Sequence, residues 1–337
     1  MGHAAQGRHF TAADAALLLA CNPGPESKPV LQVTGRKPVL SKSKRSGENA
    51  TMLPAQTYRI GYTTSGLHNH RLTEALHLLA DLGYSGVFLT LDVGHLDPQD
   101  PHLAAEIGRI REILTSRDLK AVVETGARYL LDPRRKHAPP LLADPAGTRL
   151  RFLIKAIEVA AELECGVVSF FSGHNPQGLS MEAADDRLSQ AIERLLPHAR
   201  THGVTLALEP EPGMHVERMD DFDRIRSHLG HPKELQLSLD CGHLLVTGEA
   251  EPADVIRKWK DHLCCVAIED MKRGVHEHLP FGQGDMDMKP VLAALAEIQF
   301  AGVVAVELGR HSHQGAEEAE RARNYLRSLG APFRLSP

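Results

Sequence analysis

Short apolar runs and amphipathic helical stretches alternate eight times along the chain, beginning near residue 58. Apolar runs of this length with few polar residues indicate strands that are buried on both faces, as in parallel sheets. We predict strands at residues 58–64, 86–92, 120–126, 167–172, 204–209, 235–240, 264–269 and 302–307. A predicted helix follows each strand, at residues 72–82, 101–117, 149–163, 182–202, 220–229, 252–262, 290–298 and 316–329.

Eight strand–helix units favour one α/β architecture, the (β/α)8 TIM barrel, which needs eight such units and about 250 residues. The rival is a doubly wound open sheet, which normally has a glycine-rich turn after its first strand. Here the first strand runs into Gly61-Tyr-Thr-Thr-Ser-Gly66-Leu-His, which lacks that turn. We therefore predict a TIM barrel.

The first 57 residues differ from the rest in composition. They carry seven Lys/Arg and three Asp/Glu, and residues 22–57 are rich in Pro, Lys, Ser and Gly without periodicity. Such segments bury too little apolar surface to fold. We predict that residues 1–57 are a disordered or non-native leader, with the natural start near Met52, and that residues 58–337 are a single barrel domain.

Charge and cysteine usage narrow the function classes. The formal net charge is −5, and the residues after position 57 hold 31 basic and 40 acidic side chains. An acidic body argues against nucleic acid, whose phosphates are bound by Lys and Arg. No apolar run approaches the roughly 20 residues of a membrane-spanning helix. Five cysteines without a CxxC pair do not suggest a disulfide framework, so we expect reduced thiols and a cytoplasmic protein.

Acidic residues end several predicted strands, and a TIM barrel places its active site at those ends. Glu209, Asp240 and Glu307 end the fifth, sixth and eighth strands. Three carboxylates in a low-dielectric mouth repel one another unless protons or a cation relieve the charge. We predict that these three residues bind a divalent metal, with Glu269 of the seventh strand as a further ligand.

Other polar residues near strand ends are candidates for substrate binding. They are Glu124, His174, His243, His276 and His278. Four of them also have a structural interpretation: Glu124 could pair with Arg128, His243 could pack in its turn, and the last two histidines could be solvated in a polar loop. A basic cluster from Arg134 to His137 could likewise be a solvated loop, or could capture a phosphate or carboxylate of the substrate.

These strand-end residues resemble the metal site of the xylose isomerase-like TIM barrel superfamily. The resemblance extends from residue 58 to about residue 329. That superfamily contains sugar isomerases and epimerases together with endonuclease IV-type DNA repair enzymes. Its metal ligands are Glu, Asp, His and Glu on strands five to eight, and Glu209, Asp240 and Glu307 match the carboxylates. His243 and Arg273 match positions that contact the substrate in ketose epimerases.

Two positions depart from the family pattern. Ala267 stands where the strand-seven histidine belongs, three residues before Asp270, and alanine cannot bind a metal. Glu269, a loop histidine or water would have to fill that position. His215 stands where the epimerases usually keep a glutamate behind the metal ligands.

The resemblance implies a metal-dependent isomerase or epimerase that acts through an enediolate on a sugar, keto acid or inositol-like substrate. Glu209 and Glu307 would be its acid and base. An oxygen-rich site suits Mn²⁺ or Mg²⁺, with Co²⁺ or Zn²⁺ as alternatives. The partner would be a small polyhydroxy compound, neutral or anionic, and barrels of this kind often form homodimers.

Two other functions remain open. One is an endonuclease IV-like zinc hydrolase, because His276-Glu-His278 before Gly282-Gln-Gly284 resembles a metal-binding run of that family. The acidic body and the 4% aromatic content argue against it, since few rings are available to stack on bases. The other is a catalytically degenerate barrel that binds sugar without turnover, which Ala267 would explain.

Overall fold

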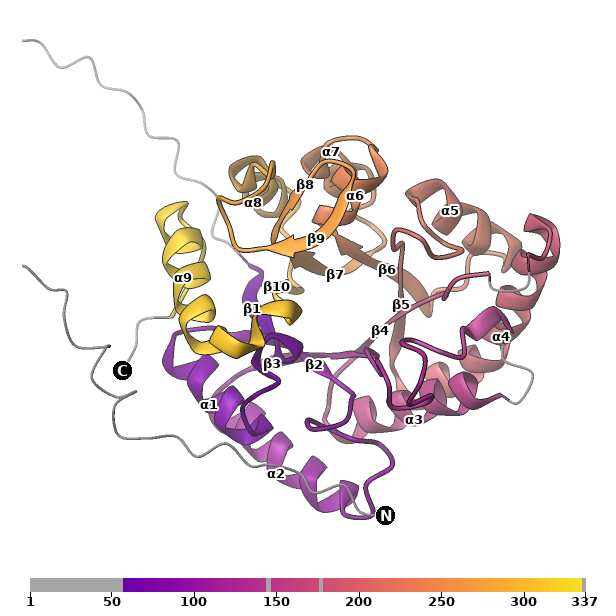
Figure 1. The fold of residues 1–337 in the computed structure, drawn as a ribbon, viewed down its shortest axis with the longest axis horizontal. Coiled ribbons are helices and arrows are strands. Elements are labelled where there is room, and N and C mark those ends of the chain that lie inside the picture. Colours follow the sequence, from indigo (N-terminus) through magenta and orange to yellow (C-terminus); the bar gives the residue numbers. More distant parts are fainter. Residues whose placement is uncertain (1–56, 144–146, 176–177, 335–337) are drawn as a thin grey trace, which may run out of the picture. The chain divides into compact units, whose positions relative to one another are not determined.

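Eight parallel strands close into a barrel in the computed structural model, which describes residues 57–143, 147–175 and 178–334 (Figure 1). The strand order around the barrel is β1-β10-β7-β6-β5-β4-β3-β2. This arrangement confirms the predicted (β/α)8 barrel. The predicted leader, except residue 57, lies outside the described residues.

The eight strands lie where the apolar runs predict them, with ends within two residues of the prediction. Their bounds are β1 Arg59–Thr63, β2 Gly86–Thr90, β3 Lys120–Glu124, β4 Val167–Phe171, β5 Thr205–Glu209, β6 Leu235–Asp240, β7 Leu263–Ile268 and β10 Val303–Val306. Most of their residues are buried, because the barrel interior covers one face and helices cover the other.

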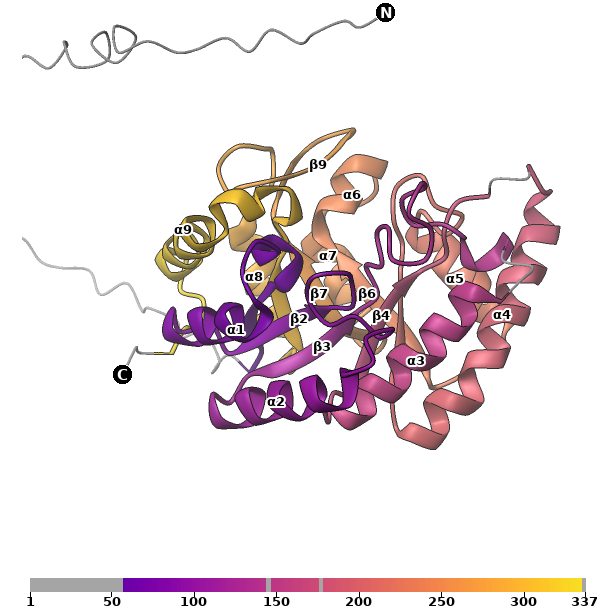
Figure 2. The ribbon, with the colours of Figure 1, turned by 60° about the horizontal axis from the view of Figure 1, so that its bottom comes forward.

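The helices form the outer layer around this barrel (Figure 2). Those that follow the predicted helical stretches are α1 Leu72–Asp81, α2 Leu103–Ser116, α3 Thr148–Glu162, α4 Met181–His202, α5 Met219–His228, α7 Pro252–Lys258, α8 Met288–Glu297 and α9 Gly315–Ser328. The end residues of α4 show why such stretches become helices. The Ser180 hydroxyl accepts a hydrogen bond from the Ala183 N–H, and Gly203 ends the helix with a φ of +66°.

Several elements were not predicted. A short helix, α6 Cys241–Thr247, follows β6 directly, and three 3₁₀ helices are η1 Thr64–Leu67, η2 Leu141–Ala143 and η3 Gly309–Gln314. The segment expected to be a polar loop is instead an antiparallel hairpin of β8 Asp270–Lys272 and β9 Val275–Leu279. In Figure 2, β9 and α6 lie together at one end of the barrel, and the two elements are in contact.

The barrel interior below this end is a small apolar cluster. It consists of Phe88, Val122, Ala207, Cys265, Ala267, Val303 and Ala305, with Val167 and Cys264 packed against it. Side chains two residues apart on a strand point to the same face. The positions two residues beyond Val122, Ala207, Ala267 and Ala305 are therefore the mouth positions of their strands, and all four hold glutamates: Glu124, Glu209, Glu269 and Glu307.

The cysteines of the described part are free thiols, namely Cys165, Cys241, Cys264 and Cys265. Cys21 lies outside the described residues. Within the described residues, no helix is both long and apolar enough to cross a membrane.

Candidate metal centre

A cavity of about 180 Å³ lies at the carboxyl ends of the strands. Its walls include six of the residues predicted from the sequence: Glu124, Glu209, His243, His276, His278 and Glu307. Two more, Asp240 and Glu269, are buried against this wall, and their side chains are 0% exposed. The strand-end pattern thus brings eight of the ten predicted residues into one region.

The remaining two predicted residues, His174 and Arg273, are not among the described residues that line the cavity. Arg273 lies in the turn of the β8–β9 hairpin, where its guanidinium donates to Glu251 at 2.8 Å and its N–H to Asp285 at 2.9 Å. The hairpin turn therefore carries this side chain to the surface, where it is half-exposed.

Asp240 ends β6 and also begins α6. Its Oδ1 accepts hydrogen bonds from the N–H groups of Gly242 at 2.7 Å and His243 at 3.2 Å. Its Oδ2 has no hydrogen-bond partner among the described residues and lies 3.3 Å from His243 Nε2. Burial and the charge of Glu269 raise the pKa of Asp240 well above its usual value. One carboxylate oxygen is thus used in the helix cap, and the other is left for a ligand.

His243 presents a bare ring nitrogen to the same space. Its Nδ1 lies 3.1 Å from the Pro210 carbonyl oxygen, which can only accept, so Nδ1 carries the proton and Nε2 carries the lone pair. Burial, together with His278 and His276, lowers the pKa of His243 well below its usual value. A neutral imidazole whose other nitrogen is fixed by a carbonyl group is the form that binds metals.

Glu269 occupies a tight space beside α6. Burial and the charge of Glu307 raise its pKa well above the usual value. Its carboxylate faces the Asp240 carboxyl and the Gly242 N–H, but neither oxygen makes a hydrogen bond of normal geometry within the described part of the chain. The space exists because position 242 is glycine: a Cβ there would lie 2.2 Å from Glu269 Oε1 and 2.8 Å from two atoms of Met271. His278 approaches from the hairpin, with its Nδ1 3.8 Å from Glu269 Oε2.

Three sets of side chains within the described part hold ligand atoms within 4.8 Å of one another. They are Glu209, Asp240 and His243; Asp240, Glu269 and His278; and His243, His276 and His278. Five of their atoms are buried without a hydrogen bond: Asp240 Oδ2, His243 Nε2, Glu269 Oε1 and Oε2, and His278 Nδ1. Each such atom costs about 1–3 kcal/mol if it is left unsatisfied. The residues present therefore fit a divalent cation.

Glu124 and Glu307 complete the acidic wall. Glu124 Oε2 accepts hydrogen bonds from the hydroxyls of Thr63 and Thr90, both at 2.8 Å, while burial and Glu307 raise the Glu124 pKa to about 7. The expected alternative, a pair between Glu124 and Arg128, does not form. Arg128 Nε instead donates to Asp92 at 2.9 Å. Burial also raises the pKa of Glu307.

Among the further cavity residues, Glu211 and Arg310 were not predicted, whereas Lys136 and His137 belong to the predicted basic cluster. Glu211 lines the cavity two residues beyond Glu209, and burial with the charge of Glu307 raises its pKa to about 7. The period of two along Glu209-Pro-Glu211 was the signal that could have identified it. Lys136 and Arg310 also line the cavity, and so does His137.

The basic cluster after β3 divides between the cavity and the surface. Lys136 and His137 line the cavity, whereas Arg134 and Arg135 are exposed and are not among its described lining residues. Arg135 Nε instead donates to Asp132 at 2.8 Å within the same loop. Lys136 and His137 are therefore the members of this cluster that are placed to contact an anionic group of a substrate in the cavity.

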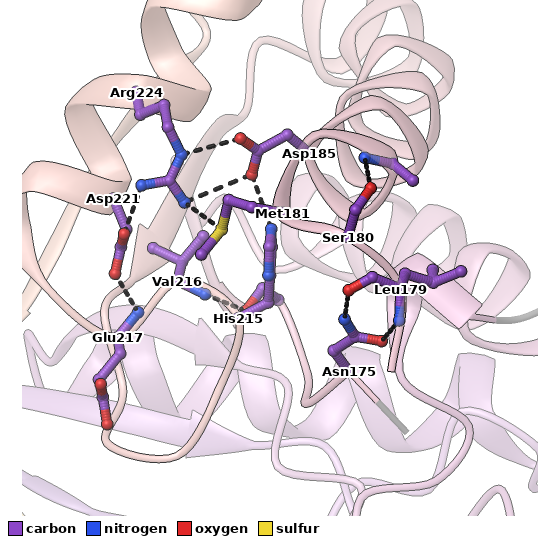
Figure 3. Close-up of polar contacts among 12 residues, drawn as sticks. Asn175, Leu179, Ser180, Met181, Asp185, His215, Val216, Glu217, Asp221 and Arg224 are labelled. Carbon is purple, nitrogen blue, oxygen red and sulfur yellow. Dashed lines mark hydrogen bonds and ion pairs between the residues drawn. The ribbon is translucent and has the colours of Figure 1, made fainter. Parts of the chain in front are cut away.

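His215, at the second departure from the family pattern, supports the loop between β5 and α5 (Figure 3). Its Nε2 donates to Asp185 Oδ1 of α4 at 2.7 Å, and Arg224 of α5 donates to Asp185 Oδ2 at 2.8 Å. The Val216 N–H donates to the Ser172 hydroxyl at 3.0 Å. These contacts hold the loop that carries Glu211.

Comparison with known proteins places this architecture among described families. The family model for "Xylose isomerase-like TIM barrel" matches residues 68–329. An inosose dehydratase of Clostridium tetani is 25% identical over 163 residues, which cover 43% of this chain and 54% of the relative. An L-ribulose-5-phosphate 3-epimerase of Salmonella paratyphi C is 24% identical over 226 residues, covering 62% of this chain and 75% of the relative.

Solved structures support the same fold. A D-allulose 3-epimerase from Methylomonas, in complex with D-allulose, superposes with a TM-score of 0.63 at 18% identity, covering 82% of this chain and 99% of that chain. The IOLI protein with a bound zinc atom has the same TM-score, identity and coverage. At this identity the likeness establishes the fold alone.

Proposed function

Because the chain belongs to the xylose isomerase-like TIM barrel family, we propose that it is a divalent-metal-dependent isomerase or epimerase. The proposed substrate is a sugar, keto acid or inositol-like compound. Relatives named as a ribulose-phosphate epimerase and an inosose dehydratase support this substrate class. The observation that carries the proposal is the placement of Glu209 and Glu307 in the wall of one cavity, with the ends of β6 and β7 between them.

Glu209 and Glu307 are suited to move a proton in both directions. Burial raises the pKa of both carboxyls, and the charge of Glu307 raises that of Glu209 further. Two interacting buried carboxyls oppose each other's ionisation, so uptake of a proton by one favours release of a proton by the other. We propose that one removes the proton next to a substrate carbonyl and that the other returns a proton to the substrate.

The proposed metal ligands are Glu209, Asp240, Glu269 and Glu307. A bound divalent cation would polarise the substrate carbonyl and stabilise the negative charge that develops when the proton leaves. Mn²⁺ or Mg²⁺ is the ion that this oxygen-rich set suits, with Co²⁺ or Zn²⁺ as alternatives. Asp240 Oδ2 and both Glu269 oxygens support this assignment, because they are buried and have no hydrogen-bond partner in the described part of the chain.

The remaining cavity residues would orient the substrate. Glu124, His243 and Glu211 offer acceptors or donors for hydroxyl groups around the acidic wall. Lys136 and Arg310 add positive charge to the same cavity. A polyhydroxy substrate that also carries a phosphate or carboxylate would use both kinds of group.

A second candidate is a zinc-dependent hydrolase, which the three clustered imidazoles favour. The ring centroids of His243, His276 and His278 lie 4.9–5.9 Å apart. Imidazole-rich sites are typical of zinc. The acidic wall of the cavity opposes a phosphodiester backbone, so we rank this candidate second.

Deuterium exchange tests the proposed function directly. The metal-loaded protein is incubated in D₂O with free ketoses, ketose phosphates, keto acids and inososes, and deuterium at the carbon beside the carbonyl is measured by NMR. We expect exchange with at least one class, and at least a 100-fold loss in Glu209→Gln and Glu307→Gln. Glu297→Gln is the matched control, because that exposed glutamate pairs with Arg257 on the outer layer.

Two results would contradict the proposal. Metal-loaded protein that binds a sugar but exchanges no deuterium would show a barrel without turnover. Zinc-loaded protein that hydrolyses a phosphodiester and exchanges nothing would favour the hydrolase.

A further inference from the structure

We infer that the β8–β9 hairpin replaces the ligand that strand β7 lacks, so that Asp240, Glu269 and His278 together hold the metal. This inference rests on the proposed metal-dependent function and extends it by a nitrogen ligand from outside the barrel strands. The resulting ligand set differs from the family pattern, in which the imidazole comes from the strand itself.

The strand-seven position at the level of Asp240 has no ligand atom to offer. Ala267 is the residue in register with Asp240, and its methyl group packs in the apolar cluster inside the barrel. Glu269, two residues further along, points to the same face from the mouth position. Glu269, the residue that follows β7, therefore offers a carboxylate nearer the mouth than the position at which the family places its histidine.

The hairpin brings an imidazole to this carboxylate. Strand β8 begins one residue after Glu269, the chain turns at Gly274, and β9 returns so that Leu279 pairs with Asp270. Asp270 fixes the return path, since its carboxylate accepts hydrogen bonds from the N–H groups of Gly282 at 2.7 Å and Met286 at 2.9 Å. His278, next to Leu279, is thereby held beside Glu269.

The distances suit one cation. Two atoms bound to the same ion at about 2.1 Å can be at most about 4.2 Å apart. His278 Nδ1 and Glu269 Oε2 are 3.8 Å apart, and the ligand atoms of the whole set lie within 4.8 Å of one another. A side-chain movement of a few tenths of an ångström would bring all three atoms to a common ion.

Charge balance favours this set over the group of three histidines. Asp240 and Glu269 are fully buried, and no Lys or Arg in the described part forms an ion pair with Glu269. A cation between these carboxylates and His278 would neutralise both charges and satisfy the unpartnered atoms. A cation among His243, His276 and His278 would leave two buried carboxylates without a positive partner, which is costly.

The ligand chemistry predicts which ions bind. Two carboxylates and one imidazole suit borderline cations such as Zn²⁺, Co²⁺ and Mn²⁺, whereas Mg²⁺ prefers oxygen ligands and several waters. We therefore expect Zn²⁺ and Mn²⁺ to bind more tightly than Mg²⁺.

Metal affinity of single variants tests the inference. The dissociation constants of Zn²⁺ and Mn²⁺ are measured on the full, untagged chain by competition with a chelator. We expect His278→Ala and Glu269→Gln each to weaken binding at least tenfold, and His276→Ala to weaken it less than threefold. His313→Ala, which removes an exposed imidazole outside the cavity, is the matched control and should change nothing.

Two further measurements make the result specific. Electron spin-echo modulation from imidazole nitrogen on bound Mn²⁺ should be present in the parent protein and weaker in His278→Ala. Thermal unfolding of the metal-free variants checks folding, and Glu269→Gln should unfold at or above the parent temperature because it removes a buried charge.

The outcomes separate this inference from the proposed function. Equal losses in His278→Ala and His276→Ala with none in Glu269→Gln would place the ion among the histidines and overturn the inference. No loss in either His278→Ala or Glu269→Gln would overturn it as well, and would leave the proposed reaction standing if exchange is observed. The expected affinity losses without deuterium exchange would support the inference and refute the proposed reaction.

Discussion

Gly242→Ala is the substitution that most directly tests the space around Glu269. Both Gly242 and Gly108 lie in helices, but only Gly242 faces an obstructed space. A Cβ at position 242 would meet Glu269 Oε1 at 2.2 Å and Met271 Cε and Cγ at 2.8 Å, whereas a Cβ at position 108 meets no atom within 4 Å. The two glycines therefore form a matched pair for the same chemical change.

The two substitutions should change the free energy of unfolding in opposite directions. Replacing a helical glycine by alanine stabilises a protein by about 0.5–1 kcal/mol, which is the expectation for Gly108→Ala. Overpacking at position 242 costs about 1–3 kcal/mol, which exceeds the helical gain, so we expect a net loss of about 1 kcal/mol for Gly242→Ala. Because Glu269 is a proposed metal ligand, its displacement should also weaken metal binding by at least the roughly 10–100-fold that the loss of a supporting group costs.

Urea denaturation of the metal-free variants measures the change in the free energy of unfolding, and competition with a chelator measures the change in metal affinity. Equal changes in unfolding free energy for the two glycine variants, with parent-like metal affinity in Gly242→Ala, would refute the reasoning. Such a result would mean that Glu269 does not occupy the space beside α6, or that the metal does not depend on it.

Two more predictions concern pH and substrate charge. Burial raises the pKa of Glu124 and Glu211 to about 7, so the folded metal-free protein binds more protons than the unfolded chain and loses stability as pH rises. Urea denaturation of the metal-free protein should show that the free energy of unfolding falls by about 0.8 kcal/mol for each group between pH 6.5 and 8. A saturating cation should abolish this fall. A free energy of unfolding that stays constant over this pH range in the metal-free protein would contradict the prediction. Lys136→Ala should raise KM for a ketose phosphate about tenfold and leave KM for the free ketose unchanged, because a phosphate gains one charge-assisted contact. Steady-state kinetics with both substrates checks this, and Arg134→Ala combined with Arg135→Ala, which alters only the exposed part of the loop, should change neither constant.

The barrel and the acidic mouth could be predicted because both depend on local patterns. The strands are short and largely apolar, and β5 and β6 each end on a carboxylate, Glu209 and Asp240. A parallel barrel then brings all strand ends together without further information. The grouping of distant acidic residues followed from topology alone.

The hairpin could not be predicted for the opposite reason. Between Val275 and Leu279 the three central residues are all polar, and the strand is short, so the segment resembles a loop. Its position depends on Asp270, which holds backbone N–H groups 12 and 16 residues away. Contacts of this kind depend on the folded path of the chain, and they place His278 beside Glu269 and carry Arg273 to the surface.

The two threonine hydrogen bonds to Glu124 give its two carboxyl oxygens different hydrogen-bonding roles. While both hydroxyls donate to Oε2, a proton taken up by the carboxyl resides on Oε1. Below its pKa, Glu124 therefore offers a donor at a defined atom, and above it the same atom becomes an acceptor. A substrate hydroxyl can satisfy either state by rotating its hydrogen, whereas a keto or ether oxygen can satisfy only the first. The contact with Oε1 would thus discriminate between oxygen types on the substrate as well as between shapes.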